Sequence, residues 1–293
     1  MEALIHTLFE SDFYRILDFK CRCRDCATSK PEYAHSFCIS FIRKGNFLFN
    51  VFRNSFDSHT GRVLITKPGY EHTVTHVHEV PDECTIFEFT HAFYQHLLAH
   101  YHTSPLDFFC NEDIHSVMLK TKAEAEYLHH AALVACMKHR VSRIELDTLV
   151  MDLVRTLMES LSSIDEGKRI KDDLKRNHLR TIEKAKAYFV SHLSENVSLK
   201  DIADHCCISI FHFSRIFKTF TSYSPANFLI NLRLKNAEVL LQNSTLPVTQ
   251  VCFSSGFNSL EYFSSAFTQK YGISPSKYRT QKFIGATIMS NTI

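Results

Sequence analysis

The sequence predicts an α+β protein, in which an N-terminal antiparallel β-barrel with helices precedes an all-α domain with two helix-turn-helix units. Three patterns indicate this: short apolar runs between turn residues, then apolar residues at helical spacing, then a repeated helical unit. The chain has 293 residues, of which 45% are hydrophobic, and this is enough for more than one core.

The distribution of charge also divides the chain. Residues 176–293 contain 13 basic and 6 acidic residues, and residues 1–175 contain 20 basic and 25 acidic residues. A charged segment lies between these halves, so we expect an N-terminal domain over 1–165, a linker over 166–176 and a C-terminal domain over 177–293. A basic domain attracts polyanions, but its charge alone does not distinguish DNA from RNA or a membrane surface.

The N-terminal region has the pattern of an antiparallel sheet. Gly45 lies between two apolar runs and can take the positive φ of a tight hairpin, and Pro68-Gly69 marks another turn. We expect the β region to end near Phe89. The expected strands are segments rich in Phe, Ile and Val at 36–42, 46–52, 62–65 and 84–89.

From 91 to about 162 the apolar spacing changes to that of helices. One interpretation is that this apolar stripe packs on the β domain, and the other is that it forms a dimerisation helix pair. The two interpretations are compatible. The stripe consists of Leu133, Val134, Met137, Leu146, Leu149, Val150, Leu153, Leu157 and Leu161.

The C-terminal half contains one helical unit twice. Six residues recur at an offset of 50, which predicts two supersecondary units of similar shape. These residues are Ser209, Phe213, Ser214, Phe217, Pro225 and Phe228, which recur as Ser259, Phe263, Ser264, Phe267, Pro275 and Tyr278.

Cap residues predict where the helices of the two units begin. Ser198 and Asp201 have the spacing of a capping box, and Ser209 can cap a second helix. Gly256 supplies a left-handed residue in the second unit. The predicted helices cover 199–205 and the residues after Ser209 in the first unit, 248–255 and 259–271 in the second, and 225–242 between them.

The C-terminal motifs resemble the double helix-turn-helix region of the AraC/XylS family of transcription regulators, over about residues 181–279. The match covers about a third of the chain. It rests on Leu199-x-x-Ile202-Ala203, Ser209-x-x-x-Phe213-Ser214-Arg215-x-Phe217-Lys218, Ser224-Pro225-x-x-Phe228, Gly256-Phe257-x-Ser259-x-x-x-Phe263-x-x-x-Phe267 and Gly272-Ile273-Ser274-Pro275-x-x-Tyr278-Arg279.

The resemblance implies double-stranded DNA as the partner, with RNA polymerase and a homodimer as further partners, and activation as the commoner outcome. Arg215 is the best candidate for a guanine contact, and a phosphate contact is its alternative. Glu261, Ser265 and Thr268 depart from the basic character that is common in the second unit. The implied DNA-binding residues are Phe211, His212, Ser214, Arg215 and Lys218, then Ser259, Leu260, Glu261, Tyr262, Ser264 and Ser265, with Lys218, Lys235, Lys270 and Arg279 at phosphates.

Residues 62–72 resemble a strand and Pro-Gly turn of the cupin-like domains that bind effectors in such regulators. Their resemblance implies a sensor of a small ligand, a metal or a redox signal. The alternative is a cupin-type metal-dependent enzyme fused to a basic helical domain. In favour of this alternative, His76 and His78 alternate on one strand, but no acidic ligand has the expected spacing.

Clustered cysteines indicate zinc or another thiolate-bound metal as a cofactor. The candidate ligands are Cys21, Cys23, Cys26 and Cys38, with His35, His72, His76 and His78 nearby. The alternatives are small buried cysteines and redox-active thiols, since Arg22 and Arg24 favour the thiolate.

We expect a cytoplasmic chain that does not cross a membrane. No stretch reaches the length of a membrane span, and the N-terminus does not resemble a signal peptide. Ten scattered cysteines in such a chain are expected to be reduced thiols.

Overall fold

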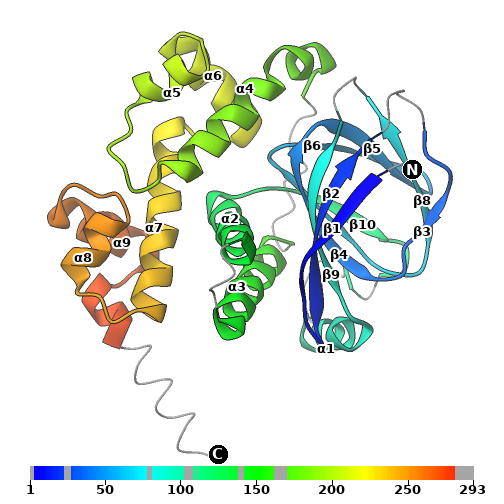
Figure 1. The fold of residues 1–293 in the computed structure, drawn as a ribbon, viewed down its shortest axis with the longest axis horizontal. Helices are drawn as coiled ribbons and strands as arrows, with labels where there is room; N and C mark the ends of the chain where they lie inside the picture. Colours follow the sequence, from blue (N-terminus) through cyan, green and yellow to red (C-terminus); the bar gives the residue numbers. More distant parts are fainter. Residues whose placement is uncertain are drawn as a thin grey trace, which may run out of the picture. The chain divides into compact units, whose positions relative to one another are not determined.

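A computed structural model describes residues 3–22, 28–77, 81–101, 108–109, 111–137, 142–161 and 170–280. The chain divides into two compact units, Met1–Glu183 and Lys184–Ile293. Among the described residues every strand belongs to the first unit, and the second is helical (Figure 1). The predicted fold class, α+β with a helical C-terminal region, is therefore confirmed. The division falls within a helix, beyond the expected linker over 166–176.

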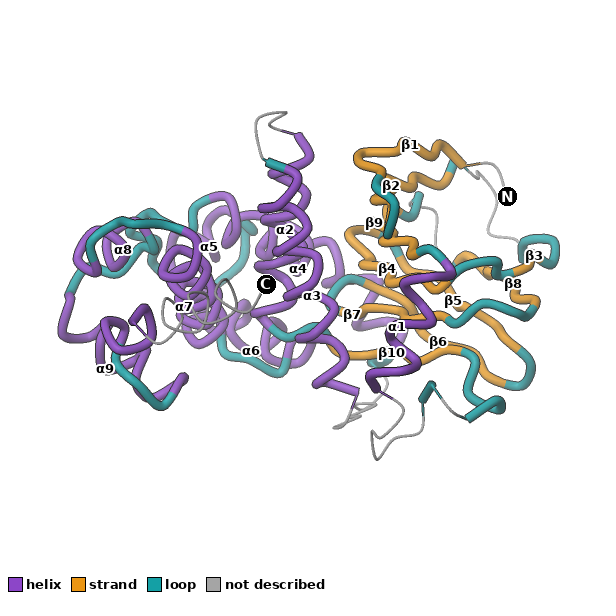
Figure 2. The backbone as a smooth tube through the Cα atoms, turned by 90° about the horizontal axis from the view of Figure 1, so that it is seen from below, coloured by secondary structure: helices purple, strands orange, loops and turns teal. Residues whose placement is uncertain are grey.

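The first unit contains two antiparallel sheets (Figure 2). One has six strands in the order β1-β2-β9-β4-β7-β10, and the other has four in the order β3-β8-β5-β6. The strands are β1 (Ala3–Glu10), β2 (Tyr14–Cys21), β3 (Glu32–Tyr33), β4 (Phe37–Lys44), β5 (Asn46–Val51), β6 (Asn54–His59), β7 (Arg62–Thr66), β8 (Glu71–His76), β9 (Glu83–Phe89) and β10 (Ser116–Lys120).

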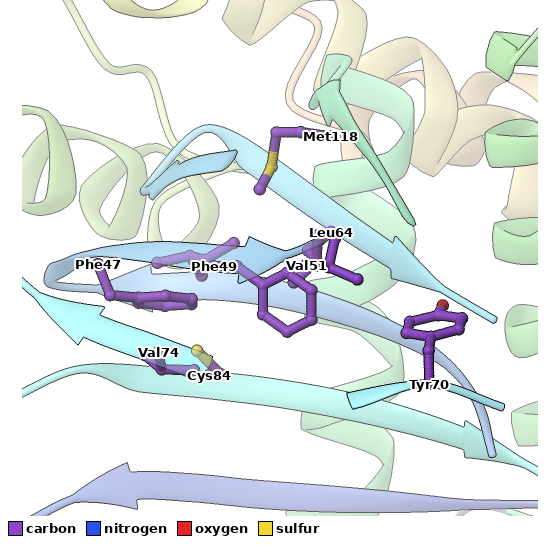
Figure 3. Packing of buried hydrophobic residues seen from close by; sticks show 9 residues of the cluster. Phe47, Phe49, Val51, Leu64, Tyr70, Val74, Cys84 and Met118 are labelled. Carbon is purple, nitrogen blue, oxygen red and sulfur yellow. The ribbon is translucent and has the colours of Figure 1, made fainter. Parts of the chain in front are cut away.

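An apolar core joins the two sheets (Figure 3). Phe47, Phe49 and Val51 alternate along β5, so that the same face of this strand buries all three side chains. The six-stranded sheet contributes Leu64 and Cys84, among others. Burial of this apolar face fixes the register of the strands, because a shift by one residue would expose it.

Strand β10 corrects the expectation that the β region ends near Phe89. Residues 116–120 pair antiparallel with β7, although they lie in a stretch that the sequence indicated as helical. A short apolar run of this length fits either a strand or a buried helical segment, so its periodicity does not decide between them. The pairing with β7 decides it.

The first unit also contains α1 (His91–Tyr101), which lies between β9 and β10 in the sequence, and α2 (Ala123–Met137) and α3 (Arg143–Leu161), which follow β10. The ring of His129 in α2 stacks on Phe41 of β4, with 4.2 Å between ring centroids. Leu133, Leu146 and Leu153 of the apolar stripe are buried, but Met137 remains 62% exposed. Packing of α2 on the sheet therefore agrees with the first interpretation of the stripe, and dimerisation stays a prediction.

The second unit contains two helix pairs that are joined by one long helix (Figure 1). Its helices are the end of α4 (Asp172–Ser191), then α5 (Leu199–His205), α6 (Ile210–Thr221), α7 (Pro225–Asn243), α8 (Val248–Ser254), α9 (Leu260–Tyr271) and a final turn at 275–280. No helix in the described ranges is both long and apolar enough to cross a membrane.

Candidate nucleic-acid interface

The first helix pair begins as the sequence predicts. The Ser198 side chain accepts a hydrogen bond from the Asp201 amide, and the Asp201 carboxylate accepts one from the Ser198 amide, so the capping box is confirmed. The side chain of Ser209 then caps α6 by accepting from the His212 amide. These caps satisfy amides that have no partner within the helix and so fix where each helix starts.

A tight turn joins α5 to α6. The amide of Ile208 donates to Ala203 O, and the amide of Cys207 donates to Asp204 O, which is the Schellman pattern at the end of a helix. This pattern needs a left-handed residue, and Cys207 takes that position with φ 56°. The turn between α5 and α6 therefore depends on a cysteine in a strained backbone conformation.

The second pair repeats these bonds. Phe257 N donates to Cys252 O, and Gly256 N donates to Phe253 O. Gly256 is the left-handed residue, with φ 86°, as the sequence predicts. The backbone hydrogen bonds of this turn correspond to those of the first turn at an offset of 49 residues. The helices α6 and α9 correspond at an offset of 50 residues, so the second turn is one residue longer.

One face of α6 and of α9 forms the core of its pair. Phe213 and Phe217 of α6 are fully buried, and so are the equivalent Phe263 and Phe267 of α9. Their rings touch neighbouring aromatic side chains, such as Phe228 of α7. Because these apolar faces are covered, the opposite faces of both helices are turned to solvent.

The exposed face of α6 is apolar and basic. Phe211, Arg215 and Lys218 lie at positions i, i+4 and i+7 and are all exposed, with Phe211 at 90%. His212 and Ser214 are half-buried, and His212 Nδ1 lies 3.5 Å from Arg215 Nη2. A bulky exposed aromatic side chain next to two cations suits a surface that meets a partner.

The exposed face of α9 carries a different set of side chains. Glu261, Ser265 and Thr268 occupy the positions that match Phe211, Arg215 and Lys218 at an offset of 50, and all three are exposed. A hydrogen bond from the Ser259 hydroxyl lowers the pKa of Glu261, which keeps it negatively charged. The two exposed helix faces therefore differ in charge.

Other predicted residues of the second helix pair have structural contacts. Ser259 caps α9 by accepting from the Tyr262 amide, and Leu260 packs partly against the second core. Tyr262 is 52% exposed and Ser264 is half-buried. Of the residues predicted to bind DNA in this helix pair, the most accessible are thus Glu261, Tyr262 and Ser265.

The structure contradicts a phosphate contact for Lys235. This side chain is 3% exposed, and its Nζ lies 2.8 Å from Glu238 Oε2, inside the domain. Glu238 also accepts from the hydroxyls of Tyr271 and Tyr278. The helical spacing of α7 alone did not show which face is covered by α9.

The other three predicted phosphate contacts are not alike. Lys218 is exposed, whereas Lys270 is half-buried and donates to Asn231 Oδ1 at 2.7 Å. Arg279 is half-buried as well. Lys218 therefore remains the most accessible cation of the predicted set.

Sequence reasoning missed Arg233 and Phe253. Arg233 of α7 donates to Leu193 O at 3.1 Å and to Glu195 O at 2.6 Å, which holds the segment before α5. Phe253 of α8 is 57% exposed. Nothing in the sequence distinguished Arg233 from cations on the surface. The spacing of apolar residues along α8 places Phe253 outside the buried face of that helix.

The two predicted thiolate ligands that the structure describes, Cys21 and Cys38, are not brought together. Lys20, next to Cys21, pairs with Glu83 of β9, whereas Cys38 pairs with Glu88 of the same strand. A separation of five positions along a strand is about 17 Å, so Cys21 and Cys38 cannot hold one ion. Cys23, Cys26 and His78 lie outside the described residues.

The histidines near that cluster are also separate. His35 lies against Tyr33, and His72 stacks on Phe49 at 4.6 Å between centroids. Among the described histidines of the predicted set, His76 lies beside a described cysteine, with Nε2 at 3.7 Å from Cys21 Sγ.

Comparisons with known proteins agree on the C-terminal unit. Residues 202–281 match a family model described as a helix-turn-helix domain. Regulatory protein PocR of Salmonella typhimurium is 31% identical over 104 residues, which are 36% of this chain and 34% of that protein. The MmsAB operon regulatory protein of Pseudomonas aeruginosa is 34% identical over 93 residues, which are 32% and 30% of the two chains.

A longer alignment exists with the HTH-type transcriptional activator RhaS of Escherichia fergusonii, which is 28% identical over 179 residues. These are 52% of this chain and 62% of that protein. The alignments thus cover less than two thirds of each of these three relatives.

Two solved structures are similar over different lengths. The DNA-binding domain of AdpA in complex with a target DNA is 29% identical, with 34% of this chain and 91% of that chain covered and a TM-score of 0.34. ToxT from Vibrio cholerae is 13% identical, with 92% and 98% covered and a TM-score of 0.35. TM-scores this low do not by themselves establish a common fold.

Proposed function

Since residues 202–281 are a helix-turn-helix domain of the AraC type, we propose that the chain is a sequence-specific regulator of transcription that binds double-stranded DNA. The observation that carries the proposal is the pair of capped helices, α6 and α9, whose apolar faces are buried while the opposite faces are exposed. Two such helices in one unit suit two contacts in the major groove.

The first helix pair, α5 and α6, supplies most of the proposed attraction. Arg215 can donate two hydrogen bonds to O6 and N7 of guanine, and the adjacent Phe211 suits the methyl group of thymine. Lys218 lies one turn further along and suits a phosphate. The flanking His212 and Ser214 are half-buried contributors to the same surface.

The second helix pair, α8 and α9, is proposed to read DNA with less positive charge on its exposed face. Tyr262, Ser264 and Ser265 offer hydroxyl groups, and Ser259 and Leu260 set the start of the helix. Glu261 suits an amino group of cytosine and opposes nearby phosphates. Specificity at this half-site then comes from hydrogen bonds, and affinity comes mainly from the first helix pair.

The N-terminal unit is proposed to sense a small ligand, a metal or a redox signal, and paired chains are proposed to occupy DNA together. Activation through RNA polymerase is inferred because RhaS, which aligns with 52% of this chain, is named a transcriptional activator. DNA binding and transcription control are thus assigned to the C-terminal unit, and the regulation of that binding to the N-terminal unit.

Selection of genomic fragments by the purified chain tests this function. Binding is measured at two salt concentrations, with and without reductant and chelator, and the retained fragments are sequenced. Enrichment of one repeated site supports a sequence-specific regulator. Retention that depends on salt but shows no sequence preference would contradict the proposal, because it would indicate that the C-terminal unit is a basic domain without specific recognition.

A further inference from the structure

Three side chains from different elements meet at one end of the first unit. Cys21 ends β2, His76 ends β8, and Asp82 directly precedes β9. Their potential ligand atoms all lie within 4.8 Å of one another. We propose that Cys21 and His76, oriented by Asp82, form a zinc site.

The distance between sulfur and nitrogen fits a shared metal ion. Cys21 Sγ lies 3.7 Å from His76 Nε2. Two ligands of a tetrahedral zinc ion, at about 2.3 Å for sulfur and about 2.0 Å for nitrogen, are themselves about 3.5 Å apart. An ion therefore enters between the two atoms with little movement of either side chain.

Asp82 occupies the outer position that zinc-bound histidines use. Its Oδ2 accepts from His76 Nδ1 at 2.5 Å, so the Nδ1 proton is held there and the lone pair of Nε2 is directed to the sulfur. A carboxylate behind a ligating imidazole fixes the ring and increases its basicity. The site thus contains both a metal-facing pair and its supporting group.

All three side chains of the proposed site are withdrawn from solvent. Cys21 is 3% exposed, His76 is 9% exposed and Asp82 is 1% exposed. Binding of a divalent ion releases the thiol proton of Cys21, so the occupied site contains a thiolate and the Asp82 carboxylate. A divalent ion with sulfur and imidazole ligands compensates both charges, and zinc prefers these donors.

The surrounding backbone is shaped around Asp82. Gly45, with φ 88°, approaches so closely that a Cβ there would lie 2.0 Å from Asp82 Oδ1. The ion would also join the two sheets, because β2 belongs to the six-stranded sheet and β8 to the four-stranded one. Zinc binding is therefore expected to raise the melting temperature of the chain.

Metal titration of the full-length chain tests the proposal. The protein is stripped with chelator under reductant, and Zn²⁺ is added in competition with a chromophoric chelator. Co²⁺ is used as a spectroscopic probe for thiolate ligation. We expect one Zn²⁺ bound per chain, and a loss of affinity of at least 100-fold in Cys21→Ser and His76→Ala.

The outer carboxylate and a remote cysteine provide two further variants. Asp82→Asn keeps the shape of the side chain and should weaken Zn²⁺ binding about 10- to 100-fold. Cys38→Ser removes a partly buried thiol from the far end of the sheet and should leave binding unchanged.

Absence of Zn²⁺ binding, or binding that is unchanged in both Cys21→Ser and His76→Ala, would overturn the proposal. If either variant fails to fold, X-ray absorption of the zinc-loaded wild-type chain decides instead. A shell with at least one sulfur and one imidazole supports the site, and a shell of sulfur alone or oxygen alone overturns it.

Discussion

Lys175 of α4 donates to both carboxylate oxygens of Asp57 in β6, with Nζ at 2.8 Å from Oδ1 and 2.9 Å from Oδ2. The lysine side chain is 3% exposed and the aspartate side chain 19%. The pair attaches the start of α4 to the β structure of the first unit. A second contact, from Gly45 N to Glu183 Oε1 at 3.1 Å, lies two turns further along α4.

Replacing Lys175 alone should destabilise this unit. Lys175→Met leaves Asp57 without its buried cation, which costs about 3 kcal/mol in the free energy of unfolding. The double variant Asp57→Asn with Lys175→Met should recover part of that loss. Urea unfolding of the full chain measures both, and a double-mutant cycle with no coupling energy would contradict a functional ion pair.

Arg215 and Lys218 should differ in what their removal changes. Arg215→Ala is expected to relax the preference for one base pair, at a cost of about 1 to 3 kcal/mol. Lys218→Ala should weaken binding to all sites alike and reduce the slope of log K against log salt by about 1. Binding to a selected site and to its single-base variants separates the two effects, and an unchanged preference in Arg215→Ala removes its assigned role.

Glu261 should weaken binding through its charge. Glu261→Gln keeps the side-chain length and removes the negative charge from the exposed face of α9, so affinity for DNA should rise at low salt and less at high salt. Glu195→Gln is the control, since Glu195 is exposed but lies outside α6 and α9. Equal increases in DNA affinity in both variants would indicate the long-range electrostatic field of the protein rather than a local contact of Glu261.

The two turns provide a matched pair of backbone substitutions. Cys207→Gly should stabilise the second unit by about 1 kcal/mol, because glycine takes the left-handed conformation without strain. Gly256→Ala should destabilise it by more than about 1 kcal/mol, since a Cβ there would also lie 2.3 Å from Leu193 O. Gly272→Ala, where the space is open, separates strain from this clash. Thermal unfolding orders the three variants.

Glu238 should make the second unit sensitive to acid. Burial alone would raise its pKa, but the Lys235 charge and the hydrogen bonds from Lys235, Tyr278 and Tyr271 together lower it from the usual 4.5. The unfolded chain therefore takes up the proton first as pH falls. The stabilisation is complete above about pH 4.5 and is lost as pH falls through the lower pKa of the folded state.

The matching measurement is urea unfolding at several pH values. Glu238→Gln should be less stable than the parent at neutral pH and should lose less stability between about pH 5 and pH 3. Parallel curves for both proteins in that range would show that the acid dependence arises elsewhere.

By itself, the sequence determined the helical part of this protein. Ser198, Ser209 and Gly256 act through hydrogen bonds and backbone angles within a few residues, so their positions predicted the ends of α5, α6 and α8. The buried faces of α6 and α9 followed from the spacing of phenylalanines, which depends only on helix geometry.

Only the tertiary structure decided which distant residues meet. Residues 116–120 became a strand because β7 offers its edge, and Lys235 became buried because it pairs with Glu238, to which two tyrosines also donate. Cys21 and Cys38 are near in sequence, yet they lie beside opposite ends of β9, whereas His76 and Asp82 reach Cys21 from other elements. Such contacts depend on strand pairing over long separations, which no local pattern of residues encodes.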